Sequence, residues 1–258
     1  MIGAIIGDIV GSVYEFANTR DYNFPLFGPY NEPTDDTVRT LAVADAILLR
    51  MPYKDSLVNW CKFYPQPMGG YGASFASWIH HPVPYDSFGN GAAMRVSPTG
   101  WAFSPEDCEA EARKSTECSH SHPEGIKGAQ TIAKAVALLR TGSGKEAVKG
   151  LCIERYGKDY KKHLPRRGVW DETCQGCVPL AIDIFLCSAS FEDAIRQAVA
   201  YGGDSDTLGA IVGSLAGAYF PIPLWIRNEA LKRLPPPMKS TLLAFERRYK
   251  IYDDRRTD

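Results

Sequence analysis

The sequence lacks several features that would assign the protein to a special class. No apolar run approaches the roughly 18 residues of a membrane-spanning helix. The N-terminus has no basic start, and Asp8 interrupts its apolar stretch, so we expect neither a signal peptide nor a membrane partner. The formal net charge of -1 provides no basic field to attract nucleic acid. The 7 cysteines, an odd number, are scattered, which favours free thiols in a reducing cytoplasm over a disulfide framework.

Patterns typical of β-strands are also missing, since no segment alternates apolar and polar residues over about five positions with β-branched enrichment. No linker rich in Pro, Ser and Gly divides the chain. Helical periodicity recurs instead. It predicts helices over residues 2–16, 34–50, 106–118, 125–140, 145–156, 178–188, 191–201, 224–234 and 238–249, one ending near 219, and a short one opening at 92. We therefore predict one all-α domain, a compact bundle of many helices over residues 1–250, with a charged tail at 251–258.

Glycines recur every four residues in two of the predicted helices. They are Gly3, Gly7 and Gly11 near the N-terminus, and Gly209, Gly213 and Gly217 near the C-terminus. Each glycine in a helix interior costs roughly 1 kcal/mol relative to alanine. The spacing clears one face of each helix for close approach of a neighbour, so we expect tight packing to offset that cost.

Two short acidic stretches, far apart in the chain, each stand at the start of a predicted helix. One is Thr34-Asp35-Asp36-Thr37, and the other is Asp204-Ser205-Asp206-Thr207. Together they could supply about six oxygen ligands, the number that Mg²⁺ or Ca²⁺ prefers. Carboxylates at a helix N-terminus also cap free N–H groups and suit the helix dipole. Capping explains each stretch separately, so the residues alone leave both interpretations open.

A zinc site is a rival interpretation for another part of the chain. Cys174 and Cys177 form a single CxxC, which Cys118, His120 and His122 could complete. A lone CxxC is a weak signal, and the other residues lack the usual zinc-ligand spacing. Buried thiols near a turn are the favoured explanation.

Four motifs, taken in order, carry a resemblance to a known family. They are Gly7-Asp8-Ile9-Val10-Gly11-Ser12-Val13-Tyr14-Glu15, Thr34-Asp35-Asp36-Thr37, Ser87-Phe88-Gly89-Asn90-Gly91-Ala92-Ala93-Met94-Arg95 and Gly202-Gly203-Asp204-Ser205-Asp206-Thr207. With them, the sequence resembles the ADP-ribosylglycohydrolases from about residue 2 to residue 220. Each motif alone is weak, but their order over this length is specific.

The resemblance implies a fold and a set of site residues. The fold would be a helical bundle with a dinuclear site in a central cleft. One Mg²⁺, or Mn²⁺ as a substitute, would be bound by Thr34, Asp35 and Asp36, and a second by Asp204, Asp206 and Thr207. Glu15 matches the family's mobile catalytic glutamate, and Asp35 and Asp204 join it as catalytic candidates. The positions that match those around ADP-ribose are Ser87, Phe88, Gly89, Asn90 and His120.

The resemblance also implies an activity, a Mg²⁺-dependent hydrolysis of the C1″ glycosidic or ester bond of ADP-ribosylated acceptors. The implied partners are ADP-ribose and ADP-ribosylated proteins, and the charge gives no reason to expect ADP-ribosylated nucleic acid. Arginine, serine, an acetyl ester and a nucleic-acid end all stay open as acceptors. The alternative is a catalytically silent relative that binds ADP-ribose, which the complete set of implied metal ligands disfavours.

Overall fold

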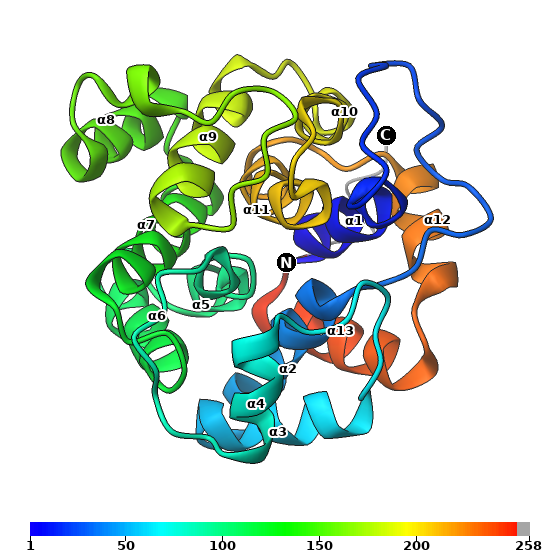
Figure 1. The fold of residues 1–258 in the computed structure, drawn as a ribbon, viewed down its shortest axis with the longest axis vertical. Helices are drawn as coiled ribbons and strands as arrows, with labels where there is room; N and C mark the ends of the chain where they lie inside the picture. Colours follow the sequence, from blue (N-terminus) through cyan, green and yellow to red (C-terminus); the bar gives the residue numbers. More distant parts are fainter. Residues whose placement is uncertain (252–258) are drawn as a thin grey trace.

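The computed structural model describes residues 1–251, which fold into thirteen α-helices and three 3₁₀ turns (Figure 1). The helices are α1 (Ile2–Gly11), α2 (Asp35–Leu49), α3 (Tyr53–Phe63), α4 (Ala73–His80), α5 (Ser97–Ala102), α6 (Cys108–Glu117), α7 (Pro123–Arg140), α8 (Lys145–Tyr156), α9 (Cys174–Cys187), α10 (Phe191–Tyr201), α11 (Ser205–Tyr219), α12 (Leu224–Arg233) and α13 (Pro236–Tyr249). Only isolated β-bridges occur in this part of the chain. The predicted all-α class is confirmed.

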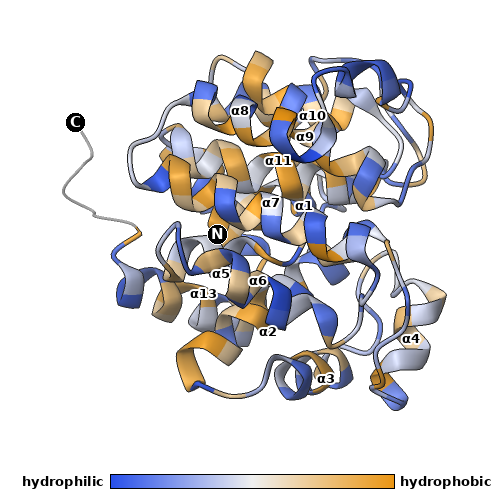
Figure 2. Cartoon of the chain, turned by 90° about the vertical axis from the view of Figure 1, so that its left-hand side faces the viewer, coloured by the Kyte–Doolittle hydropathy of each residue, from blue (hydrophilic) through white to orange (hydrophobic). Residues whose placement is uncertain are grey.

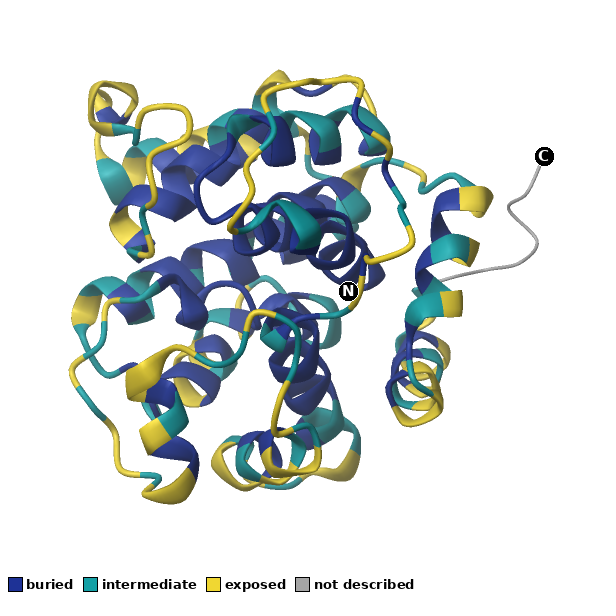
Figure 3. Cartoon of the chain, turned by 45° about the vertical axis from the view of Figure 1, so that its right-hand side comes forward, coloured by how far each residue is buried: buried dark blue, intermediate teal, exposed yellow. Residues whose placement is uncertain are grey.

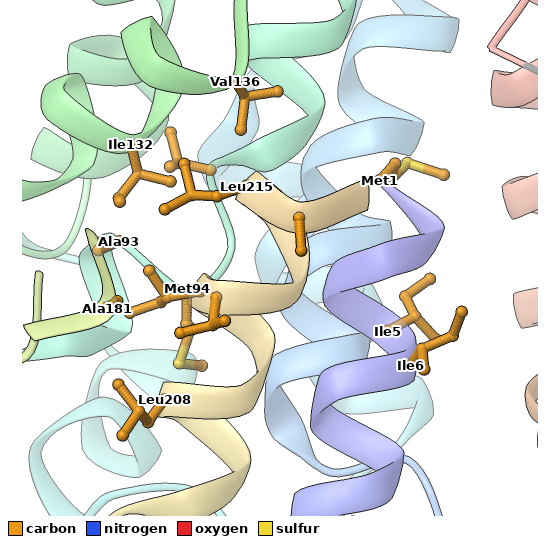
Figure 4. Packing of buried hydrophobic residues seen from close by; sticks show 14 of the residues in the cluster. Met1, Ile5, Ile6, Ala93, Met94, Ile132, Val136, Ala181, Leu208 and Leu215 are labelled. Carbon is orange, nitrogen blue, oxygen red and sulfur yellow. The ribbon is translucent and has the colours of Figure 1, made fainter. Parts of the chain in front are cut away.

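Helices α1 and α11 lie side by side at the centre of the molecule (Figure 1, Figure 4). Their glycines face each other, since a Cβ added to Gly209 would lie 2.5 Å from the carbonyl oxygen of Gly7. The two helices run antiparallel, because Gly11 at the end of α1 meets Asp206 in the first turn of α11. The close packing predicted for each glycine series is confirmed, and the partner of each series is the other.

The side of α11 that faces away from α1 carries much of the apolar core. Leu208 and Leu215 point from it toward a group that includes Ile132 and Val136 of α7 (Figure 4). Every residue of α1 is buried. Figure 3 shows buried residues gathered at the centre and exposed ones at the edges, and the outer helices carry both hydrophilic and hydrophobic residues (Figure 2). No helix within residues 1–251 combines the length and apolar character needed to cross a bilayer.

Several predicted helix boundaries are wrong. The first helix ends at Gly11, and a 3₁₀ turn over Ser12–Tyr14 replaces its last turn. Helix α9 begins earlier than predicted, because Thr173 caps it by accepting a hydrogen bond from the backbone N–H of Gly176. Residue 92 belongs to the 3₁₀ turn Asn90–Ala92 rather than opening a helix.

Three helices between residues 51 and 105 were not predicted, namely α3, α4 and α5. Helix α3 buries only Ser56, Leu57 and Cys61, so its apolar stripe is too short to stand out in the sequence. Helix α5 has only six residues. Apart from Ile251, the charged tail predicted at 251–258 lies outside the described residues.

The contact between the glycine faces can be tested by adding one methyl group. We expect G7A to lower the free energy of unfolding by about 3 kcal/mol, because the new Cβ overlaps the backbone at Gly209. G150A is the control, since Gly150 lies in α8 and a Cβ there meets no heavy atom within 4 Å. The control should gain about 0.5–1 kcal/mol. Urea denaturation measures both, and similar effects of the two changes would contradict this packing.

Candidate active site and metal centre

A buried carboxylate on α1 fixes the start of α2. Asp8 is fully buried and accepts hydrogen bonds from the hydroxyl of Thr34 (2.7 Å) and the backbone N–H of Thr37 (3.1 Å). The backbone N–H of Thr34 and the hydroxyl of Thr37 also donate to it. Burial raises the pKa of Asp8 to about 7, although these hydrogen bonds act in the opposite direction. The first acidic stretch is therefore fastened to the central helix.

The first acidic stretch caps α2 and also presents carboxylates. The side chain of Thr34 accepts a hydrogen bond from the backbone N–H of Asp36, so a hydroxyl caps α2 rather than the predicted carboxylates. At the start of α11, Asp204 makes no side-chain cap bond, so capping does not explain the second stretch. Asp35 lines a cleft and accepts a hydrogen bond from the guanidinium of Arg39 at 2.9 Å. Asp36 lies deeper and accepts from the hydroxyl of Thr207 at 3.1 Å. The last contact joins the two acidic stretches directly.

The second acidic stretch meets Glu15 in the same cleft. One oxygen from each of Glu15, Asp204 and Asp206 lies within 4.8 Å of the other two. Among the described residues, this is the one group of at least three His, Cys, Asp or Glu side chains close enough to hold a metal ion. Asp204 also accepts a hydrogen bond from the side-chain amide of Asn90 at 2.6 Å.

The electrostatics of the cluster favour a bound cation. One carboxylate oxygen of Asp36 and one of Asp206 are buried without a hydrogen-bond partner. Burial, and then repulsion from neighbouring carboxylates, raises the pKa of both residues well above the usual value. Burial and the charge of Asp204 likewise raise the pKa of Glu15 to about 8. Oxygen ligands without hydrogen-bond donors, under mutual repulsion, fit a hard divalent cation.

The cleft of 330 Å³ collects most of the predicted site residues. Those that line it are Glu15, Asp35, Ser87, Gly89, Asn90, His120, Asp204, Asp206 and Thr207. Thr34 and Asp36 lie behind this lining, and Phe88 packs against His122 at the surface. A larger cavity of 570 Å³ elsewhere is lined mainly by proline and apolar residues. Because the carboxylates converge only on the smaller cleft, we take it as the site.

His120 enters the cleft as a neutral side chain. It is buried, and its Nδ1 lies 2.9 Å from the hydroxyl of Ser119. Burial, followed by the positive charges of Arg95 and Arg39, lowers the pKa of His120 well below its usual value. A neutral imidazole can orient a ligand through a hydrogen bond without adding charge to the site.

Some cleft residues were missed by sequence reasoning. Arg39 is buried, contacts Asp35 and donates to the carbonyl oxygen of Gly91 at 3.0 Å. Phe16 and Trp170 stack with ring centroids 5.5 Å apart and line the cleft although both are exposed. Residues this distant in the chain are brought together only by the tertiary fold, and no local pattern marked them.

The CxxC cysteines have other surroundings. The thiol of Cys174 donates toward the carbonyl oxygen of Gly89 at 3.2 Å. Burial raises the pKa of both Cys174 and Cys177, which disfavours the thiolate form that binds zinc. The interpretation as buried thiols near a turn agrees with this placement.

The fold and the cleft define an all-α protein with a candidate centre for divalent cations. The family model described as ADP-ribosylglycohydrolase matches residues 1–255, so the chain belongs to this family of enzymes. The predicted family and enzyme class are thus confirmed.

Several named relatives agree with this assignment, and a solved structure shares the fold. The chain is 25% identical to ADP-ribosyl-[dinitrogen reductase] glycohydrolase of Rhodospirillum rubrum, with 85% of this chain and 83% of the relative covered. It is 26% identical to human ADP-ribosylhydrolase ARH3 (Homo sapiens), covering 85% and 84%. It is 25% identical to ADP-ribosylarginine hydrolase Tri1 of Pseudomonas putida, covering 89% and 73%. A solved ADP-ribosylglycohydrolase-related protein complex contains the same fold, with a TM-score of 0.75, 24% identity and 95% of both chains covered.

The elevated pKa values predict how stability depends on pH without metal. A carboxyl whose pKa is raised by folding stabilises the folded state below its unfolded pKa, and this contribution is lost as pH rises through the folded pKa. Since the folded pKa is about 7 for Asp8 and about 8 for Glu15, chelated protein should lose thermal stability from about pH 5 to about pH 8.

Saturating Mg²⁺ should reduce this loss, because a cation binds the deprotonated carboxylates of the folded state. Scanning calorimetry with chelator and with Mg²⁺ measures both curves. A melting temperature of the chelated protein that rises or stays level across this interval would contradict the prediction.

Proposed function

We propose that the protein hydrolyses the bond between C1″ of ADP-ribose and a protein side chain, and that it uses two Mg²⁺ ions. One ion would be held by Thr34, Asp35 and Asp36, and the other by Asp204, Asp206 and Thr207, with Mn²⁺ as a substitute. The observation that carries the proposal is the meeting of both acidic stretches with Glu15 in one cleft. Bound cations would polarise and orient the ribose hydroxyls and a water molecule.

Glu15 would donate and accept the proton that is transferred in this reaction. It lines the cleft, is partly exposed, and has an oxygen near those of Asp204 and Asp206. Burial is the largest cause of its raised pKa, and burial favours the protonated carboxyl. The carboxyl can give this proton to the leaving atom and then accept one from water.

The other cleft residues would bind and orient the ligand. Ser87, Gly89 and His120 line the cleft beside the carboxylates and provide polar contacts for ADP-ribose. Asn90 acts through Asp204, since its amide holds one oxygen of that carboxylate. Asp35 is similarly oriented by Arg39.

The loss of one ligand tests the metal centre. We expect D206N to weaken Mn²⁺ binding by at least about 100-fold and to abolish turnover, since Asp206 supplies an unpartnered buried oxygen. Calorimetry with Mn²⁺ and release of ADP-ribose from ADP-ribosylated proteins measure the two effects. D159N is the control, because Asp159 is exposed and, within residues 1–251, its side chain pairs only with Lys162.

The melting temperature of D206N in chelator should match or exceed that of the wild type, because the change removes a repelled carboxylate. Unchanged hydrolysis by D206N would refute the proposed site. Binding of ADP-ribose by the wild type without cleavage of any conjugate would instead support the catalytically silent alternative.

For the acceptor, we propose an arginine side chain. Of the acidic residues that line the cleft, Glu172 is the one that the proposal assigns neither to a metal ion nor to proton transfer. Phe16 and Trp170 present stacked exposed rings, and the indole N–H of Trp170 donates to Glu172. Aromatic faces beside carboxylates suit a planar cation. The relative Tri1 is named as an ADP-ribosylarginine hydrolase.

A matched pair of substrates tests the acceptor. We expect E172Q to lower kcat/KM on arginine-linked ADP-ribose about 3- to 5-fold and to leave serine-linked ADP-ribose nearly unchanged, because only arginine brings a cation to Glu172. Glu146 is 87% exposed on α8, so E146Q serves as the control. Equal effects of E172Q on both substrates would contradict this acceptor.

A further inference from the structure

The loop between α3 and α4 has a defined shape where it passes the cleft. Met68 forms an isolated parallel bridge with Thr34, which ties the loop to the first acidic stretch. The hydroxyl of Tyr71 donates to the carbonyl oxygen of Tyr64 at 2.7 Å and closes the loop. Gly69 and Gly70 both have positive φ, at 77° and 81°.

The carboxylate of Glu15 lies directly against this loop. A Cβ added to Gly69 would stand 2.5 Å from Oε2 of Glu15, 3.4 Å from its Cδ and 3.6 Å from its Oε1. Within residues 1–251, no hydrogen bond or ion pair to the Glu15 carboxylate is found. The carboxylate therefore stands, without a polar partner among these residues, in the space that a side chain at position 69 would fill.

Backbone conformation alone does not explain the need for glycine at position 69. Gly70 has nearly the same φ, and a Cβ there would meet nothing within 4 Å. Both positions resist a side chain because positive φ is unfavourable for L-residues. Only at Gly69 would the side chain also enter the space that Glu15 occupies.

We infer that Gly69 is a positioning residue for Glu15. Its missing side chain leaves the space in which the Glu15 carboxylate stands beside Asp204 and Asp206. The inference rests on the proposed function, in which Glu15 transfers the proton. The space that Glu15 occupies is thus bordered by the α3–α4 loop. Through Met68, this loop is attached to the first acidic stretch.

Alanine at each glycine separates the two explanations. G69A and G70A introduce similar backbone strain, and only G69A displaces Glu15. We expect G69A to lower kcat about 10- to 100-fold with KM changed less than about 3-fold, since a small misplacement of a catalytic group is costly. G70A should change kcat less than about 2-fold. Equal kcat values for the two variants would overturn the inference.

A double-mutant cycle tests whether the effect passes through Glu15. In an E15A background, G69A should cause no further loss of residual activity, because the side chain that it displaces is gone. An additional loss as large as in the wild-type background would overturn the inference. If G69A alone does not fold, E15A should restore its melting temperature to that of G70A, and failure to restore it would count against the contact.

Mn²⁺ binding provides a measurement that does not depend on catalysis. Displacing Glu15 removes one of the three carboxyl oxygens that converge there, so G69A should weaken Mn²⁺ binding several-fold in calorimetry, as E15A should, while G70A should not. If the wild type cleaves no conjugate, the proposed function fails and this measurement still tests the positioning. If the wild type is active but G69A and G70A bind Mn²⁺ and turn over alike, the positioning fails alone.

Discussion

The glycine-to-glycine contact between α1 and α11 sets the geometry on which the rest of the site depends. Because neither helix has side chains at this contact, Gly11 can press against Asp206 in the first turn of α11. A short 3₁₀ turn follows α1, and it places Glu15 beside Asp206. From the same helix, Asp8 holds the start of α2. All three acidic elements are thus placed by one helix.

This arrangement concentrates negative charge where the protein is least able to solvate it. Burying a carboxylate without a partner costs free energy, so packing of the core does not explain why these carboxylates are there. Thr34 caps the backbone at the start of α2, and the next residue, Asp35, presents its carboxylate to the cleft. A cation that binds only the folded arrangement would convert this repulsion into folding stability.

The sequence predicts best where one helix face decides the structure. The helix at 191–201 matches α10 at both ends, because it has a regular apolar stripe. The bounds of 145–156 also match those of α8. The four-residue spacing of the glycines predicted close packing for each helix. It could not predict that the two helices pack against each other, because spacing within one helix does not identify its neighbour. The roles of Arg39 and Gly69 depend on contacts between segments distant in the chain, which a single sequence does not encode locally.

The proposed metal ligands and the proposed acceptor contacts come from different kinds of structure. The carboxylates stand at the starts of α2 and α11, on helices fixed to the core, so their geometry resists change. The residues around them at the cleft, Phe16, Gly69 and Trp170, come from loops. Loops tolerate substitution more readily than packed helices. A family with this division can retain one way of breaking the ribosyl bond while the surrounding loops adapt to different acceptors.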